Sequence, residues 1–305
     1  MTGFVTLAVG NEQYYKLAAN LLQSYKLNGN CDAPFAIFAD RKNKYTDLFD
    51  KVIILDHPHL SYLDKLEMLS MPPYEHNIFI DADCLIYNDV SLLIQYSNLN
   101  GVRCFGKALE LSSTDGWFLI DDIGEYKHQV KFIPSMHGGI IYFASDSLTR
   151  DVYDLALKIS SNYAAYRFKH FEKPADEPIL ALSLAVNNCA PIELDKAQAG
   201  RAFCFLPTVK KIKMHIRKKL LIYTTNDHDY TYKETIVLHW QNCMTTKPIY
   251  NREVDRMSMG DAKAEWRFIL RWIKYHVLTI FSRSLRFFER CKCFLFDIKT
   301  HNYSK

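Results

Sequence analysis

Short apolar runs that each end in an aspartate constrain the fold of this chain most strongly. They are Phe35–Ala39 before Asp40, Val52–Leu55 before Asp56, and Ile78–Ile80 before Asp81. Phe4 to Val9 forms a similar run, which ends at Gly10-Asn11. Uninterrupted apolar runs are typical of strands in a parallel sheet that is buried on both faces. We therefore predict a buried parallel sheet in the first third of the chain.

Helical patterns separate these runs. Apolar residues recur at helical spacing between Leu17 and Tyr25, and Ser61 to Met71 predicts a helix that Pro72-Pro73 ends. Alternating strands and helices are typical of a Rossmann-like α/β sheet that binds nucleotides. Ligands in such sheets bind beyond the carboxyl ends of the strands, where these aspartates are expected.

The pattern of the later sequence is less regular. It predicts strands at 139–144 and 235–240 and helices at 147–160 and 177–186. The stretch NREVDRMSMGD near 250–262 is polar and contains a glycine, which is typical of a boundary. We therefore expect one domain over residues 1–250 and a separate tail over 251–305.

Asp81 and Asp83 are the first candidates for chemistry. Residues two apart in a strand point to the same side, so both carboxylates are expected at one point past the sheet edge. Two uncompensated carboxylates repel each other there, and a hard divalent cation such as Mg²⁺ or Mn²⁺ removes the conflict. A strand-end turn with two solvated aspartates is the alternative.

A second candidate group follows the last predicted strand. His239 ends that strand, and Lys247-Pro248 follows it. A neutral imidazole is a plausible third metal ligand, and a lysine offers a positive charge to phosphate oxygens. A packed structural histidine beside Trp240 is the alternative.

Together these pieces resemble a GT-A-fold glycosyltransferase of family 8, the type of glycogenin and bacterial lipopolysaccharide galactosyltransferases. The resemblance covers residues 4 to 250 and rests on four motifs in the family's order. These are FIDAD at 79–83, MHGGIIYF at 136–143, Asp176-Glu177-Pro178, and His239 with Lys247-Pro248. The chain departs from the family pattern at His137 (asparagine in the family), Glu177 (glutamine) and Ile249 (tryptophan), and its His-to-Lys spacing is two residues longer.

The resemblance implies an activity and a set of roles. It implies a hexosyltransferase that uses Mn²⁺ (or Mg²⁺) and a UDP-sugar, with residues 1–250 as the catalytic domain and retention at the anomeric carbon. The implied metal ligands are Asp81, Asp83 and His239. The implied donor-binding residues are Val9, Asn11, Tyr14, Lys65, Asp81, Ala82, Gly138 and Gly139, and the implied catalytic residues are Asp176, Glu177 and Lys247.

Each of these roles has a structural alternative. Asn11 has the residue type of a helix N-cap, and Lys65 could lie on a solvated helix face. Gly138 and Gly139 could simply shape a turn. Asp176 and Glu177 precede Pro178, as acidic residues at a helix start often do.

The tail carries the positive charge of the chain. Residues 263–292 hold eight Lys or Arg and two Asp or Glu, a net charge of +6, whereas the rest sums to −2. Apolar residues recur at helical spacing from Trp266 to Phe281, with Arg267, Arg271 and Lys274 on other faces. This pattern predicts a helix that lies on an anionic membrane surface. The alternative is a helix docked on the catalytic domain with its basic face in water.

The composition of the chain and its lack of recognisable targeting signals indicate where the protein is expected to act. We find no secretory signal, no apolar run long enough for a transmembrane helix, and no nucleic-acid-binding motif, so nucleic acid is not an expected partner. The eight cysteines are scattered, which favours reduced thiols in the cytoplasm. We therefore expect a cytoplasmic enzyme on the inner face of the plasma membrane that transfers sugar to a glycan or lipid-linked acceptor in surface polysaccharide synthesis. A non-catalytic glycan- or partner-binding relative and a sugar nucleotidyltransferase are the alternatives.

Overall fold

The computed structural model describes residues 1–226, 231–241 and 244–277. The chain divides into two compact units, Met1–Asn242 and Cys243–Lys305.

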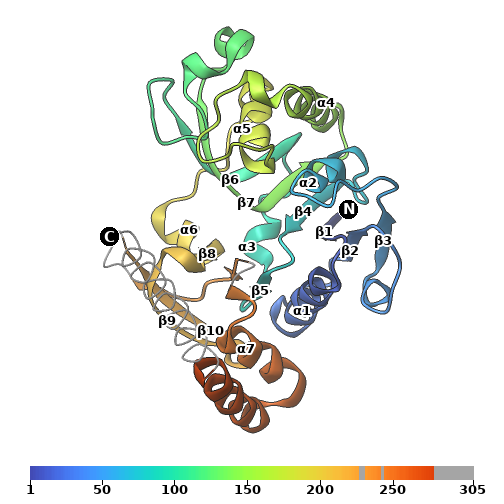
Figure 1. The fold of residues 1–305 in the computed structure, drawn as a ribbon, viewed down its shortest axis with the longest axis vertical. Coiled ribbons are helices and arrows are strands. Elements are labelled where there is room, and N and C mark those ends of the chain that lie inside the picture. Colours follow the sequence, from blue (N-terminus) through green and yellow to red (C-terminus); the bar gives the residue numbers. More distant parts are fainter. Residues whose placement is uncertain (227–230, 242–243, 278–305) are drawn as a thin grey trace, which may run out of the picture. The chain divides into compact units, whose positions relative to one another are not determined.

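A central sheet of six strands organises the first unit, in the order β3-β2-β1-β4-β7-β6 (Figure 1). The strands are β1 (Thr2–Ala8), β2 (Phe35–Ala39), β3 (Lys51–Ile54), β4 (His76–Ile80), β6 (Val102–Leu109) and β7 (Ile133–Ala144). β1 pairs in parallel with β2 and β4, and β2 with β3. The chain is thus a mixed α/β protein, and the predicted apolar runs of its first third form its parallel strands.

The other half of the sheet, for whose strands the sequence predicted no direction, is antiparallel. β7 runs antiparallel to both β4 and β6. Parallel neighbours require a long crossover, usually a helix. The connection at residues 110–132 instead contains only the 3₁₀ turns η3 (Ile120–Asp122) and η4 (Gly124–His128), so β7 returns beside β6 in the opposite direction.

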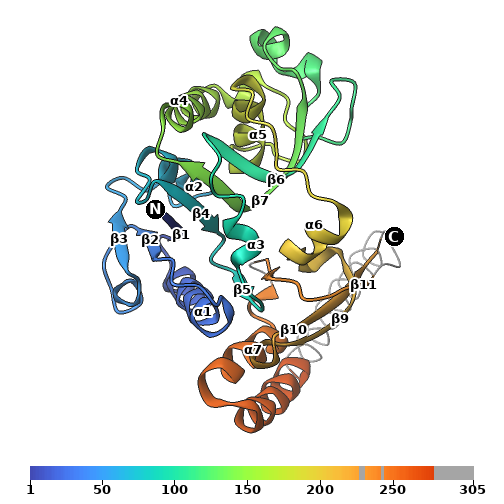
Figure 2. The ribbon, with the colours of Figure 1, turned by 180° about the vertical axis from the view of Figure 1, so that it is seen from behind.

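Helices cover both faces of the sheet. α1 (Glu12–Asn28) lies on one side, and α4 (Ser147–Ser161) and α5 (Asp176–Val186) lie on the other (Figures 1 and 2). β2 is therefore buried along its whole length, as its uninterrupted apolar sequence predicts. α5 is almost entirely buried, which explains its weak amphipathic pattern.

The helix predicted over Ser61 to Met71 is shorter in the structure. α2 covers Asp64–Glu67 and continues as the 3₁₀ turn η2 (Met68–Ser70). The side chain of Asp64 accepts hydrogen bonds from the backbone N–H groups of His59 and Ser61, at 2.6 and 3.1 Å. Asp64 therefore shapes the preceding loop rather than extending the helix, and this loop faces the site described below.

Two small sheets complete the first unit. The first has the order β5-β12-β8, from β5 (Cys84–Ile86), β12 (Val237–His239) and β8 (Phe203–Phe205). The second has the order β11-β10-β9, from β9 (Val209–His215), β10 (Leu220–Thr225) and β11 (Thr231–Tyr232). The short helices α3 (Ser91–Ile94) and α6 (Lys196–Ala202) lie between these elements in sequence.

The second unit is helical in its described part. α7 covers Pro248–Met259, Gly260 follows with φ +81°, and residues 261–277 form a further helix. The segment predicted as a polar boundary therefore lies mostly within α7. In the described ranges no helix combines the length and apolar character needed to cross a bilayer. Ile280 and Phe281, part of the predicted tail helix, lie outside the described residues.

Candidate metal and nucleotide site

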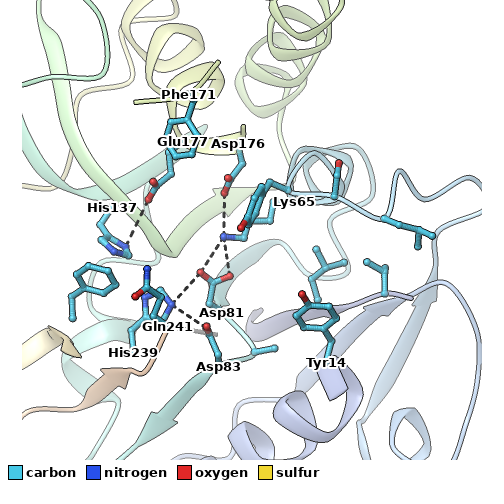
Figure 3. Close-up of a pocket in the computed structure, with 17 residues that line it drawn as sticks. Tyr14, Lys65, Asp81, Asp83, His137, Phe171, Asp176, Glu177, His239 and Gln241 are labelled. Atoms are coloured by element: carbon cyan, nitrogen blue, oxygen red, sulfur yellow. Dashed lines mark hydrogen bonds and ion pairs between the residues drawn. The ribbon is translucent and has the colours of Figure 1, made fainter. Parts of the chain in front are cut away.

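A cavity of about 680 Å³ opens where the strand order of the central sheet reverses. The chain passes from β1 outward to β2 and β3 and then returns to β4 on the other side of β1. In open α/β sheets this switch point is where ligands bind. Leu7 and Val9 from the end of β1 line the cavity together with Asp81, Ala82 and Asp83 from the end of β4 (Figure 3).

Pairing between β5 and β12 brings His239 to the two aspartates. Cys84 lies opposite His239 in this antiparallel pair, and the backbone N–H of Trp240 donates to the carbonyl of Asp83 at 3.1 Å. Nε2 of His239 consequently lies 3.0 Å from Oδ1 of Asp83 and 3.9 Å from Oδ2 of Asp81 (Figure 3). Backbone hydrogen bonds thus fix the positions of these three donors.

Lys65 joins two of the acidic residues. Its Nζ lies 2.9 Å from Oδ1 and 3.0 Å from Oδ2 of Asp81, and 3.1 Å from Oδ2 of Asp176 (Figure 3). Burial alone would lower the pKa of Lys65. The charges of Asp176 and Asp81 outweigh this effect and raise the pKa well above the usual value. Lys65 is therefore an ammonium ion inside the site, and the alternative of a solvated helix-face lysine is wrong.

Glu177 and His137 form the opposite wall. The N–H of Gly138 donates to Oε1 of Glu177 at 2.7 Å, and the N–H of Gly139 donates to Nδ1 of His137 at 3.0 Å. Burial raises the pKa of Glu177. Burial also lowers the pKa of His137 to about 3, so its imidazole is neutral with Nδ1 as the acceptor.

The site holds more negative than positive charge. Asp81, Asp83, Asp176 and Glu177 all line the cavity, and they share it with Lys65 and His239. Burial raises the pKa of Asp81, although the charges of Lys65 and His239 oppose that shift. For His239, burial lowers the pKa, but the hydrogen bond and charge of Asp83 and the charge of Asp81 raise it overall. A divalent cation would neutralise the excess of carboxylates.

The donor atoms suit a hard cation. Two carboxylate oxygens and an imidazole nitrogen are ligands that Mn²⁺ or Mg²⁺ accepts. Nδ1 of His239 is buried, lies against Gly139, and has no hydrogen-bond partner among the described residues, so the ring lacks the outer-shell partner usual for metal-bound histidine. Asp81, Asp83 and His239 thus fit a metal by donor type and position, and the unpartnered Nδ1 departs from the usual surroundings of such a histidine.

Cys84 is a possible donor that the sequence did not indicate. Its Sγ and donor atoms of Asp83 and His239 all lie within 4.8 Å of one another. Burial raises the pKa of Cys84 well above the usual value, so the thiol stays protonated and is a poor ligand for a hard cation. The sequence signal for Cys84 is its position directly after Asp83.

The other predicted residues fall into three groups. Tyr14, Val9 and Ala82 line the cavity, as do Asp176 and Glu177. Asn11 does not line the cavity, and its side chain accepts a hydrogen bond from the N–H of Gln13 as the N-cap of α1, which was the alternative. Gly138 and Gly139 act through their backbone N–H groups.

Lys247 belongs to the second unit. It is the N-cap residue of α7, and its Nζ lies 2.5 Å from the hydroxyl of Tyr275. Its expected role at phosphate oxygens stays a prediction.

Several aromatic and loop residues of the cavity were not predicted from the sequence. Phe171, Phe205 and Tyr62 line it, and the ring of Phe205 lies 4.6 Å from that of His137. Nothing in their local sequence distinguishes them from core aromatics. Asp40, noted for its position after a strand, accepts from the N–H of Gly10 at 3.0 Å and pairs with Arg41, and so holds the loop after β1.

Comparison with known proteins adds no assignment. No protein-family model matches the chain, and a search of curated proteins finds no match.

Proposed function

We propose that this chain is a metal-dependent glycosyltransferase that moves a hexose from a UDP-sugar to a glycan or lipid-linked acceptor. The observation that carries the proposal is the convergence of Asp81, Asp83 and His239 at the strand switch point. There Nε2 of His239 lies within 4.0 Å of both carboxylates, inside a cavity that also holds Lys65 and two further acids. The GT-A fold and the DxD role of Asp81-Ala82-Asp83 are part of this proposal.

The chemistry of the donor explains why such a site would act on it. Breaking a bond between a sugar and a diphosphate leaves negative charge on the diphosphate, and catalysis depends on stabilising that charge. Asp81, Asp83 and His239 would hold Mn²⁺, which supplies positive charge to the leaving diphosphate. Lys65 adds an ammonium ion beside the same position, and Lys247 is proposed to assist.

The two ends of the cavity suit the two ends of the donor. Val9 and Tyr14, beyond β1, offer an apolar wall and an aromatic ring to the base and ribose. Asp176 and Glu177, at the start of α5, face the region expected to hold the sugar, with Gly138 orienting Glu177. Glu177 could then act as a nucleophile or stabilise positive charge on the sugar, which is consistent with a retaining reaction.

Two other classes use similar features. A sugar nucleotidyltransferase opens with a phosphate loop rich in Gly and Arg, whereas AVGNEQYY has one glycine and no arginine. A non-catalytic binder of glycans or partners would not need a metal. The excess of carboxylates in the cavity favours a cation-binding enzyme over that binder.

The deciding experiment is Mn²⁺-dependent hydrolysis of a panel of nucleotide-sugars. We expect the unmodified chain to hydrolyse one UDP-sugar, and Asp83→Ala to lose that activity. Asp56→Ala is the matched control, because Asp56 follows β3 but does not line the cavity. Absence of turnover together with absence of UDP binding in the presence of Mn²⁺ would refute the proposal and favour the non-catalytic class.

The setting of this activity is also a proposal. A lipid-linked acceptor would place the enzyme on the inner face of the plasma membrane, in the synthesis of a surface polysaccharide.

A further inference from the structure

The helix at residues 261–277 is attached to α7 by its charged side. Nη1 of Arg271 lies 2.5 Å and Nη1 of Arg267 lies 3.6 Å from the carboxylate of Asp255 on α7. Asp255 itself is buried, with its side chain 8% exposed. Arg256 of α7 pairs with Glu265. Arg271 and Glu265 of this helix therefore pair with α7, while the side chain of Arg267 stays 53% exposed.

Aromatic and cationic contacts extend the same interface. The guanidinium of Arg252 lies 4.5 Å from the ring centroid of Phe268, and Nζ of Lys247 lies 4.9 Å from that of Tyr275. Ala264 is fully buried. Residues 264, 268, 271 and 275 recur every three or four positions, so they form one face of the helix, and that face is the one in contact with α7.

The opposite face is apolar and exposed. The exposed fractions of its residues are 64% for Trp266, 47% for Ile269, 51% for Leu270, 49% for Ile273 and 58% for Val277. Their spacing of three and four residues makes them a continuous stripe. Trp272, also 49% exposed, lies beside it. Contiguous exposed apolar surface of this kind marks an interaction site.

We propose that this stripe inserts into a lipid leaflet, so that helix 261–277 is a hydrophobic anchor held in the plane of a membrane. Two tryptophans are suited to the interface between headgroups and acyl chains. The charge of the helix and of the sequence that follows it fits anionic headgroups, because residues 263–292 together carry a net charge of +6. Lys263 and Lys274 lie at the edges of the stripe by helical spacing, where long side chains reach headgroups.

The contacts of Arg267 and Arg271 distinguish this anchor from a basic patch. Asp255 holds Arg271 at 2.5 Å but contacts the half-exposed Arg267 only at 3.6 Å, so apolar insertion rather than arginine–headgroup pairing is the principal source of binding in this proposal. Arg271 thus pairs with α7, whereas Arg267 keeps the exposed position expected from the sequence. Apolar insertion is insensitive to ionic screening, whereas a surface ion pair weakens with salt.

The test is cosedimentation of the full chain with phosphatidylcholine vesicles, with and without phosphatidylglycerol. We expect the full chain to bind, and the double substitution Trp266→Ser with Ile273→Ser to lower the partition coefficient by more than about tenfold. Binding by the unmodified chain should persist between about 0.1 M and about 0.5 M NaCl. Leu157→Ser is the control, because Leu157 is a 37% exposed leucine on α4 in the other unit.

Two results would overturn the anchor. Vesicle binding that the double substitution leaves unchanged, or that about 0.5 M NaCl abolishes, would assign binding to basic residues elsewhere. Absence of vesicle binding, with a dimer in sedimentation velocity that the double substitution converts to monomer, would assign the stripe to a second copy of the chain. Circular dichroism confirms that each variant is folded. No nucleotide-sugar is present, so this result is independent of the proposed enzyme activity.

Discussion

Nε2 of His239 lies 3.0 Å from Oδ1 of Asp83, and backbone hydrogen bonds join β12, which ends in His239, to β5, which Asp83 directly precedes. A donor set held by strand pairing is rigid, since moving one side chain out of register requires breaking the pair. This rigidity is what a metal site needs if its ligands are to keep their geometry through a reaction.

Removing the imidazole should weaken metal binding. His239→Ala is expected to lower Mn²⁺ affinity by at least about tenfold, because outer-shell changes alone have effects of about 10–100-fold. Isothermal titration calorimetry measures this affinity directly. His57→Ala, an exposed histidine that does not line the cavity, should bind Mn²⁺ as the unmodified chain does. Equal affinity of both variants would exclude His239 as a ligand.

Lys65 should contribute to the stability of the fold as well as to binding of the proposed UDP-sugar. Lys65→Met leaves Asp81 and Asp176 in a buried site without their shared cation. Breaking a buried ion pair in this way destabilises by about 3–5 kcal/mol, which urea unfolding would detect. Lys158→Met is the control. Its partner Glu125 is exposed, so the free energy of unfolding should hardly change. Similar unfolding midpoints for the two variants would contradict the bridging role of Lys65.

Glu177 should reduce stability at neutral pH. Burial raises its pKa, so the folded state binds this proton more tightly than the unfolded state does. Its favourable contribution is complete below the unfolded pKa and is lost as pH rises through the folded pKa. Glu177→Gln should therefore be more stable than the unmodified chain at pH 7, and this advantage should shrink in acid, while activity falls.

Thermal unfolding of Glu177→Gln and of the unmodified chain, measured from acid to neutral pH, would show how their difference in stability changes with pH. Full transfer activity of Glu177→Gln would exclude a catalytic role for the carboxylate. Asp176→Asn changes the neighbouring residue, and its effect on stability would instead measure the ion pair between Asp176 and Lys65.

Gly139 should tolerate no side chain. A Cβ atom there would lie 2.8 Å from Cζ of Phe203 and 3.1 Å from Nδ1 of His239. Gly139→Ala is expected to destabilise by about 1–3 kcal/mol and to weaken Mn²⁺ binding through displacement of His239. At Gly138 the nearest atoms belong to the flexible side chain of Glu177, at 3.1 Å, so Gly138→Ala should perturb stability less. Unfolding and Mn²⁺ titration of both variants test this order.

The parallel half of the fold was predictable from the sequence because β1, β2 and β4 are mostly buried and therefore consist mostly of apolar residues. The run Phe35–Ala39 is both the predicted strand and the observed β2. β7 was only partly predicted: its apolar end at 139–144 was found, but its first half, from Ile133, contains Pro134 and the polar Ser135 and His137. Its antiparallel direction depends on a connection that contains only short 3₁₀ turns and no crossover helix, and no pattern within β7 itself shows this.

The sequence predicted some residues of the site and not others. Asp81 and Asp83 could be recognised as a pair because they lie two residues apart directly after a buried strand. The proximity of Lys65 to Asp176 could not be derived, since it depends on a loop shaped by Asp64. The pairing of Arg271 with Asp255 could not be derived either, because helical spacing does not show which residue of another helix an arginine contacts.

The pairing of β5 with β12 also sets an order of assembly during synthesis. β1 to β4 and their helices come from the first part of the chain, so parallel pairing among them can begin early. The His239 donor emerges only near the end of the first unit. Until then the carboxylates of Asp81 and Asp83 have no imidazole beside them. The nascent chain can therefore form much of its central sheet well before the proposed metal site is complete.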